Sequence, residues 1–166
     1  GIDPRSGDVA PQGTFDVVVP TTLPEGGRVD SAFFVLTYPA DKLRVERVDN
    51  LLPANWQDEN LGFFNSIDFS QPGRISFDQT AGWANSELLP VGPTQRQDLA
   101  RIVFSVTQQG REGDRLPLTI TEAAVRTTTD EELIRGNFEG GIYTLSTPAC
   151  PAGQIRQPDG SCRAPV

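Results

Sequence analysis

The side chains that could do chemistry in this chain are carboxylates, because the sequence contains no histidine. Histidine-based triads, histidine metal sites and histidine proton shuttles are therefore excluded. A pair of carboxylates could serve glycoside hydrolysis, and Asp68 and Asp78 lie on two neighbouring predicted strands. Sheet surfaces commonly carry such carboxylates in solvent, and no glycine-rich phosphate motif follows a predicted strand. We therefore expect that the protein is not an enzyme.

Two acidic segments could offer oxygen ligands to a calcium ion. Asp130, Glu131 and Glu132 form one, and Asp159 with Gly160 forms the other. Neither has the alternating spacing of a high-affinity calcium loop. Residues 129–132 have instead the spacing of a helix capping box. We expect a short helix there, and neither a metal ion nor another cofactor on this chain.

The two cysteines, Cys150 and Cys162, enclose a segment rich in proline and glycine. Two nearby cysteines without histidine make a poor zinc site, so we predict a disulfide between them. A disulfide indicates an extracellular or cell-surface protein. The pair lies in a polar tail, residues 147–166, which the bond would stiffen without governing the stability of the rest.

Composition limits the class of protein. The net charge of −8 offers no basic stripe for a nucleic acid, and no segment is long and apolar enough to insert into a membrane. The 166 residues include 16 glycines and 14 prolines, which suits one all-β domain of short strands. We expect this domain over residues 9–146, after a flexible segment, residues 1–8, whose start can be interpreted as a remnant of expression.

Alternating apolar residues predict where the strands lie. The segment 31–48 indicates a strand, a tight turn at residues 39–41 and a second strand. Further strands are predicted over residues 14–20, 63–69, 74–79, 98–107, 116–125 and 141–145. The pair 63–69 and 74–79 is predicted to form a hairpin. The inward positions predict a core of Phe34, Leu36, Tyr38, Ile75, Phe77, Ile102, Phe104 and Val106.

Four segments resemble a bacterial cohesin module, the partner of dockerin in cellulosome-like assemblies. The sharpest, residues 34–45, is similar to the family's F-x-L-x-Y-D-P-x-x-L-x-V signature, with Pro39 where the family usually has aspartate. Residues 97–106 resemble its G-x-L-A-x-I-x-F-x-V strand, with Gln97 replacing the glycine. Residues 11–20 and 138–145 resemble its opening and closing strands. The family's first strand has no convincing equivalent before Pro11.

The resemblance implies a nine-stranded jelly-roll β-sandwich that presents one flat sheet face to dockerin, with calcium on the dockerin. Polysaccharide would then be reached only through the partner. In the alternative interpretation, the apolar part of that face is covered by a loop of the same chain after Leu51, and not by a partner. Transfer of the family's partner-facing positions predicts the following binding residues: Phe33, Val35, Thr37, Arg74, Ser76, Asp78, Leu99, Arg101, Val103 and Ser105.

A carbohydrate-binding module of a secreted polysaccharide-degrading protein is the alternative, because such modules share the sandwich architecture. They need a row of exposed aromatic rings, for which Trp56, Trp83 and Tyr143 are the candidates. Tryptophans in a sandwich are more often partly buried anchors, and these three residues lie in separate segments. We therefore favour dockerin binding.

Overall fold

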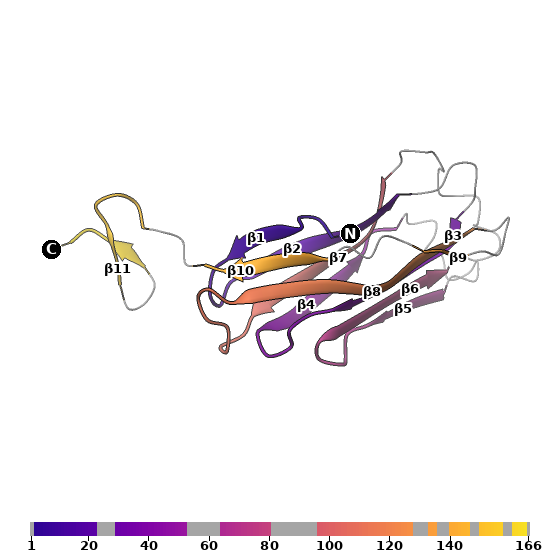
Figure 1. Ribbon diagram of the computed structural model, residues 1–166, viewed down its shortest axis with the longest axis horizontal. Coiled ribbons are helices and arrows are strands. Elements are labelled where there is room, and N and C mark those ends of the chain that lie inside the picture. Colours follow the sequence, from indigo (N-terminus) through magenta and orange to yellow (C-terminus); the bar gives the residue numbers. More distant parts are fainter. Residues whose placement is uncertain are drawn as a thin grey trace.

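The computed structural model describes residues 2–22, 29–52, 64–80, 96–127, 133–135, 140–146, 150–157 and 161–165. All regular elements within these ranges are β-strands, which confirms the all-β prediction. Most of them form two facing layers (Figure 1). The strands are β1 (Ser6–Val9), β2 (Thr14–Thr22), β3 (Val29–Thr37), β4 (Leu43–Asn50), β5 (Phe64–Asp68), β6 (Arg74–Thr80), β7 (Arg96–Val106), β8 (Arg115–Thr127), β9 (Leu133–Arg135), β10 (Gly141–Leu145), β11 (Ile155–Arg156) and β12 (Cys162–Arg163).

The two layers differ in size. The large sheet has the order β1-β10-β8-β3-β6-β5, with β9 also paired to β8, and the small sheet has the order β2-β7-β4. Among the described residues the sandwich therefore contains ten strands, where nine were expected. Two of these strands, β1 and the three-residue β9, lie outside the segments predicted as strands.

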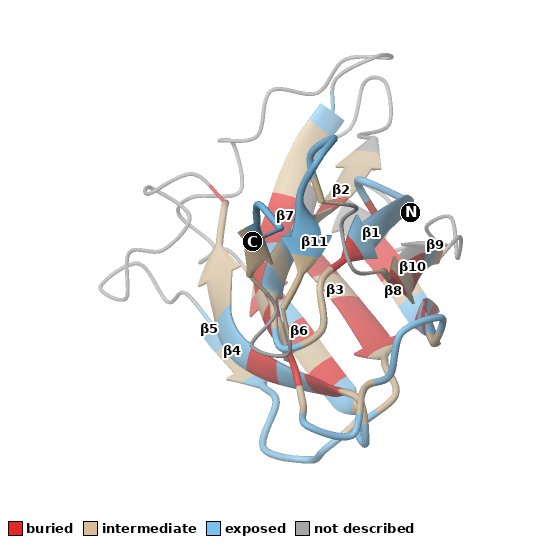
Figure 2. Ribbon diagram, turned by 90° about the vertical axis from the view of Figure 1, so that its left-hand side faces the viewer, coloured by how far each residue is buried: buried red, intermediate tan, exposed pale blue. Residues whose placement is uncertain are grey.

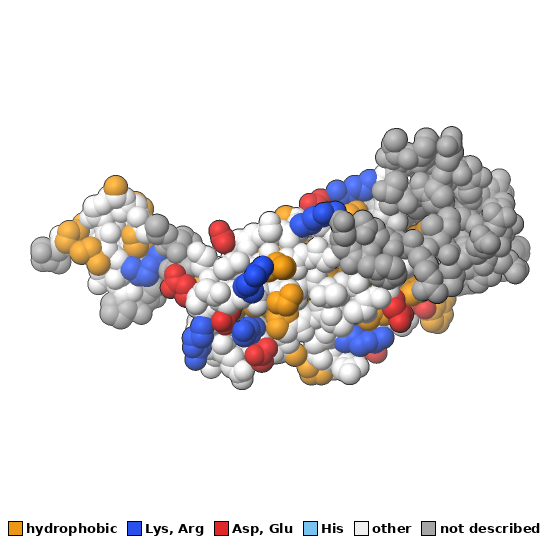
Figure 3. Space-filling view, viewed as in Figure 1, with side chains coloured by type: hydrophobic (Ala, Val, Ile, Leu, Met, Phe, Trp, Pro, Cys, Tyr) orange, Lys and Arg blue, Asp and Glu red, His pale blue; other side chains and the backbone are white. Residues whose placement is uncertain are grey.

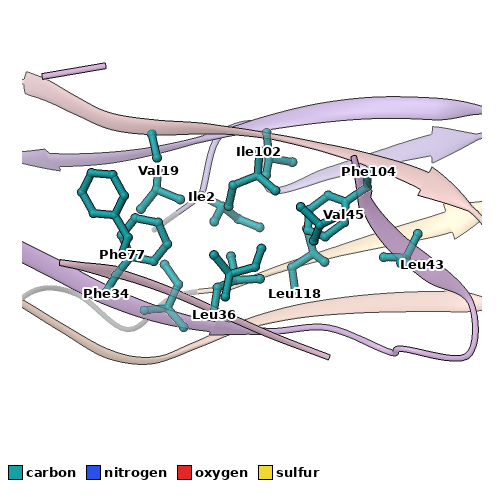
Figure 4. Packing of buried hydrophobic residues seen from close by; sticks show 14 of the residues in the cluster. Ile2, Val19, Phe34, Leu36, Leu43, Val45, Phe77, Ile102, Phe104 and Leu118 are labelled. Atoms are coloured by element: carbon teal, nitrogen blue, oxygen red, sulfur yellow. The ribbon is translucent and has the colours of Figure 1, made fainter. Parts of the chain in front are cut away.

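The core lies between the sheets and contains the predicted residues. Side chains from both layers point toward one another (Figure 4). Phe34 and Phe77 stack at a centroid distance of 5.0 Å, and Phe104 is fully buried. Tyr38 is half-buried and packs edge-on against Phe104 at 5.4 Å. Buried and exposed residues alternate along the strands, as in β7 (Figure 2).

Two predicted turns have different roles. The hairpin of β5 and β6 is confirmed, and Gly73 closes it at a φ of 85°, a conformation that glycine adopts without strain. The turn after β3 instead carries the chain from one sheet to the other. There β3 pairs with β6 and β8, whereas β4 pairs with β7.

The N-terminal segment is part of the sandwich. Ile2 is 2% exposed within the core, and Asp3 exchanges two backbone hydrogen bonds with Val18, both 2.8 Å long. The next residues form β1, which pairs in parallel with β10. The structure thus differs from the expected flexible segment 1–8, and β1 is a strand before Pro11 that the sequence pattern did not reveal. Sequence reasoning missed β1 for two reasons. Apolar and polar residues hardly alternate along it, and it pairs with β10, a strand from the far end of the sequence.

The predicted disulfide is present in the tail. Cys150 is bonded to Cys162, the first residue of β12, with the two Cα atoms 5.6 Å apart, so the bond joins residue 150 to the hairpin of β11 and β12. Figure 1 shows this hairpin beyond the end of the sandwich. No helix of the described residues is long and apolar enough to cross a membrane.

Several predictions fall on residues outside the described ranges. These are the capping box and acids of residues 129–132, the Asp159–Gly160 pair, and both tryptophans, Trp56 and Trp83. Within the described ranges, the structure contains no group of three or more acidic or cysteine side chains placed to hold a metal ion.

Candidate functional site: two opposite sheet faces

The ten predicted binding residues lie on two different sheets. Strands β3 and β6 belong to the large sheet, whereas β7 is the central strand of the small sheet. The outward sides of two packed sheets point in opposite directions. The expectation of one shared face is therefore wrong, because alternation shows which side chains point outward but not which sheet a strand joins.

We call the outward side of β8, β3, β6 and β5 the large-sheet face. It carries Phe33, Val35, Thr37, Arg74, Ser76 and Asp78 from the prediction, together with Phe64, Ser66, Asp68, Glu122 and Ala124. We call the outward side of β2, β7 and β4 the small-sheet face. It carries Thr14, Asp16, Val18, Arg44, Glu46, Arg47, Asp49, Arg101, Val103 and Ser105.

The large-sheet face has an apolar centre built by strand register. Phe33 lies opposite Ala124 on β8 and opposite Asp78 on β6. One row further along, Val35 lies opposite Ser76 and Glu122. Phe33 is partly exposed and Val35 is 9% exposed. Small hydroxyl and acidic side chains thus surround an apolar pair.

Sequence reasoning missed the outer strand of this face. Phe64 on β5 is 54% exposed, the same side of the strand carries Ser66 and Asp68, and β8 contributes Glu122. The hairpin prediction contained the signal for β5, because its pairing with β6 fixes which residues point outward. No local signal marks Glu122, since β8 is far from β3 in the sequence.

The carboxylates of the large-sheet face differ in electrostatics. Partial burial raises the pKa of Asp78. The hydroxyl of Ser70 donates to Asp68 Oδ1 over 2.6 Å and its backbone N–H over 2.9 Å, which lowers the pKa of Asp68. Register places Asp68 opposite Ser76 and Asp78 opposite Ser66, so the two carboxylates are diagonal neighbours.

Ion pairs cover the small-sheet face. Arg44 Nη2 lies 2.7 Å from Glu46 Oε1, and Ser105 Oγ donates to the same oxygen over 2.5 Å. The hydrogen bond from Ser105 and then that from Arg44 lower the pKa of Glu46. Arg47 Nε lies 2.9 Å from Asp49 Oδ1. On the side of the molecule seen in Figure 3, charges of both signs are likewise mixed.

Leu99 belongs to neither face. The register of β2 against β7 shifts between Val19, opposite Ala100, and Pro20, opposite Asp98, so Leu99 sits in a bulge. It is 4% exposed and packs in the core. The prediction that Leu99 points outward is therefore wrong, because a bulge breaks the alternation.

Tyr143, a candidate sugar platform, is also in the core. It is 4% exposed, its ring lies 4.6 Å from that of Phe15, and its hydroxyl donates to the Pro4 carbonyl. Burial, followed by the charges of Asp3 and Asp16, raises its pKa to about 12. The ring is therefore not available to stack on a sugar.

A two-layer β-sandwich is the architecture of many protein-binding and sugar-binding modules. Among solved structures, it is similar to the sixth cohesin of scaffoldin B from Acetivibrio cellulolyticus, solved with a mutant Cel5 dockerin. That match has a TM-score of 0.65 and 18% identity over 87% of this chain and 96% of that one.

Two further structures support the same fold. The third ScaC cohesin of Acetivibrio cellulolyticus, solved with the ScaB dockerin, has a TM-score of 0.63 and 14% identity over 85% of this chain and 94% of its own. A cohesin module from a family 33 glycoside hydrolase of Clostridium perfringens has a TM-score of 0.62 and 14% identity. The match covers 84% of this chain and 90% of that module. No protein-family model and no curated protein matches the sequence. The predicted resemblance is confirmed in the structure: the fold is cohesin-like.

Proposed function

We propose that this chain is a non-catalytic module that binds a dockerin-type protein through the large-sheet face. The observation that carries this proposal is the partly exposed Phe33 at the centre of hydrogen-bonded strands, with the exposed ring of Phe64 toward the sheet edge. Interface cores favour aromatic and aliphatic side chains inside a polar rim. Similar cohesins have been solved with dockerins bound.

Asp78 adds a second reason to prefer this face. Its carboxyl group has a raised pKa, and among the contacts of the described residues it has neither a hydrogen bond nor an ion pair. It lies opposite Phe33 at the apolar centre. An arginine or lysine of the partner would supply the missing positive charge. The resulting ion pair would lie beside Phe33, where the interface excludes water and screens the two charges least.

The small-sheet face fits a partner less well. Its carboxylates already pair with arginines of the same chain. A protein partner broad enough to cover all of these pairs would desolvate them without offering better contacts, which is unfavourable. Of the originally predicted residues, we therefore keep Phe33, Val35, Thr37, Arg74, Ser76 and Asp78 as the partner-binding set, and remove those of β7.

The setting follows from the tail and the fold. The Cys150–Cys162 disulfide is typical of an oxidising compartment, which supports an extracellular or cell-surface location. The large-sheet face is formed by hydrogen-bonded strands before any partner arrives, so little ordering entropy is lost on this side. The calcium would belong to the dockerin, and polysaccharide would be reached through the partner.

One pair of variants tests the assignment. Phe33→Ala removes the apolar centre and is expected to weaken dockerin binding by about 1–3 kcal/mol. Arg101→Ala, on the opposite sheet, is the matched control and should leave binding unchanged. The measurement is calorimetry against a panel of calcium-loaded dockerins that includes the Cel5 and ScaB dockerins, repeated with a chelator, which should abolish binding.

The possible failures have separate meanings. If Arg101→Ala weakens binding while Phe33→Ala does not, the face is wrong and the function stands. If no dockerin of the panel binds the unmodified chain, the proposed function itself is wrong. Circular dichroism of both variants checks that the sandwich is intact.

A further inference from the structure

A shallow depression lies on the small-sheet face, on the other side of the sandwich from the proposed dockerin site. Its volume is about 400 Å³. It is lined by Thr14, Phe15 and Asp16 from β2, Arg47 from β4, and Arg101 and Val103 from β7. Because it uses none of the residues of the large-sheet face, its role is independent of the proposed function.

Strand register centres the depression on Val103. Asp16 on β2 and Arg47 on β4 both lie directly opposite Val103, and Arg101 is the next outward residue along β7. A small apolar side chain thus lies between one carboxylate and two guanidinium groups. Larger charged side chains around a smaller central one leave a hollow.

The guanidinium groups around this hollow keep unused donors. Within the described part of the chain, the contact of Arg101 is an ion pair with Asp16 at 3.5 Å, and no hydrogen bond accompanies it. Arg47 donates through Nε to Asp49 at 3.1 Å, which leaves its terminal Nη groups without a hydrogen bond among the described residues. Each guanidinium offers five N–H donors.

These groups call for a ligand with three properties. A carboxylate would satisfy the fork of guanidinium donors. Hydroxyl groups would donate to Asp16 and exchange hydrogen bonds with Thr14. A small apolar face would rest on Val103. A uronic acid unit of a polysaccharide has all three, whereas an acidic peptide brings carboxylates without hydroxyl donors for Asp16.

We propose that the depression binds the uronic acid units of an acidic oligosaccharide. Arg47 and Arg101 hold the sugar carboxylate, and Asp16 and Thr14 orient its hydroxyl groups. Since the site is open and the protein carries a net charge of −8, the affinity is low for a single unit and falls as salt screens the arginines. A module of this kind would contact an acidic polysaccharide on one side and a protein on the other.

Tetragalacturonate is the probe, with cellotetraose as the neutral sugar and tetraglutamate as the acidic peptide. We expect tetragalacturonate to shift the backbone amide resonances of Asp16, Arg47 and Val103 at ligand concentrations up to about 10 mM. Arg47→Gln and Arg101→Gln should each weaken binding about fivefold or more, because each removes a charge-assisted contact. Arg44→Gln, on the same strand as Arg47 but outside the depression, is the matched control and should change binding less than about twofold.

Four results would overturn the proposal. The first is that tetragalacturonate causes no resonance shifts. The second and third are that cellotetraose or tetraglutamate binds as tightly as tetragalacturonate. The fourth is that Arg44→Gln weakens binding as much as Arg47→Gln or Arg101→Gln does. The third would identify a general anion site, and the fourth a diffuse attraction by surface charge. Unchanged thermal unfolding of the three variants excludes a folding defect, since all three arginines are exposed.

Discussion

The two outer faces of the sandwich differ in whether their carboxylates are paired with cations of the same chain. On the small-sheet face, Glu46 accepts hydrogen bonds from Arg44 and Ser105, and Arg47 pairs with Asp49. On the large-sheet face, Asp78 lies partly desolvated beside Phe33, and no contact of the described residues supplies a countercharge. The carboxylates Glu46 and Asp49 are thus paired within the chain, whereas the large-sheet face carries a carboxylate that a partner could pair.

This difference concerns binding more than stability. Exposed ion pairs such as Arg44–Glu46 contribute little to folding, because solvent screens the two charges. Their effect is to keep the small-sheet face polar and unfavourable for a protein partner to cover as a whole. The core between the sheets supplies the stability that holds both faces in place.

The largest expected effect comes from removing a ring from that core. Phe104 is fully buried and packs against Phe15 at 5.4 Å and against Tyr38 at 5.4 Å. Phe104→Ala should lower the free energy of unfolding by roughly 3–5 kcal/mol through lost burial and a residual cavity. Urea unfolding measures it. Ser105→Ala, the next residue on the outward side, should cost less than about 0.5 kcal/mol; equal losses would mean that the register of β7 is wrong.

The next effect concerns the polar link between the sheets. Gln79 is fully buried. Its Oε1 accepts from Asn50 Nδ2 on β4 over 2.8 Å, and its Nε2 donates to Asn65 Oδ1 on β5 over 2.7 Å. Gln79→Met keeps the length of the side chain and breaks both bonds. Because Asn50 and Asn65 lose their partner, we expect a loss of about 2 kcal/mol.

Hydrogen exchange distinguishes this link from simple packing. In Gln79→Met the amides of β5 should exchange faster than those of β2, since Asn65 is on β5. Gln109→Met, at an exposed position of the turn after β7, is the control and should change neither stability nor exchange. Unchanged protection of β5 would show that the amide link does not hold that edge of the large-sheet face.

The sequence predicted the inward side of each strand better than the place of the strand. Alternation correctly placed Phe34, Ile75 and Ile102 in the core, because side-chain direction is a local property of a strand. Membership of a sheet depends on pairing between distant segments. The residues of β7 were therefore assigned to the same face as Phe33, although β7 pairs with β2 and β4.

The other errors have the same origin. The bulge that buries Leu99 appears only in the register between β2 and β7, and the pairing of β1 with β10 joins the two ends of the domain. The hairpin of β5 and β6, in contrast, is local and was predicted. Its turn residues and alternation are all contained in one short segment.

The smallest expected effect tests the contrast within the large-sheet face itself. Partial burial raises the pKa of Asp78, so the folded state binds its proton more tightly than the unfolded state does. The charged form therefore opposes folding above the folded pKa, and this penalty disappears as the pH falls below the unfolded pKa. Asp78→Asn should be more stable than the unmodified chain at pH 7, by less than about 0.5 kcal/mol because solvent screens the site, and the difference should vanish near pH 3.

Asp68→Asn is the matched control with the opposite sign. Hydrogen bonds from Ser70 lower the pKa of Asp68, so its charged form favours folding above the unfolded pKa and this contribution is lost as the pH falls through the folded pKa. Asp68→Asn should therefore be less stable than the unmodified chain at pH 7. Urea unfolding of both variants at pH 7 and near pH 3 measures the two differences. If both variants shift stability in the same direction at pH 7, Asp78 has a countercharge in the folded chain. The reason for preferring the large-sheet face at that position would then be lost.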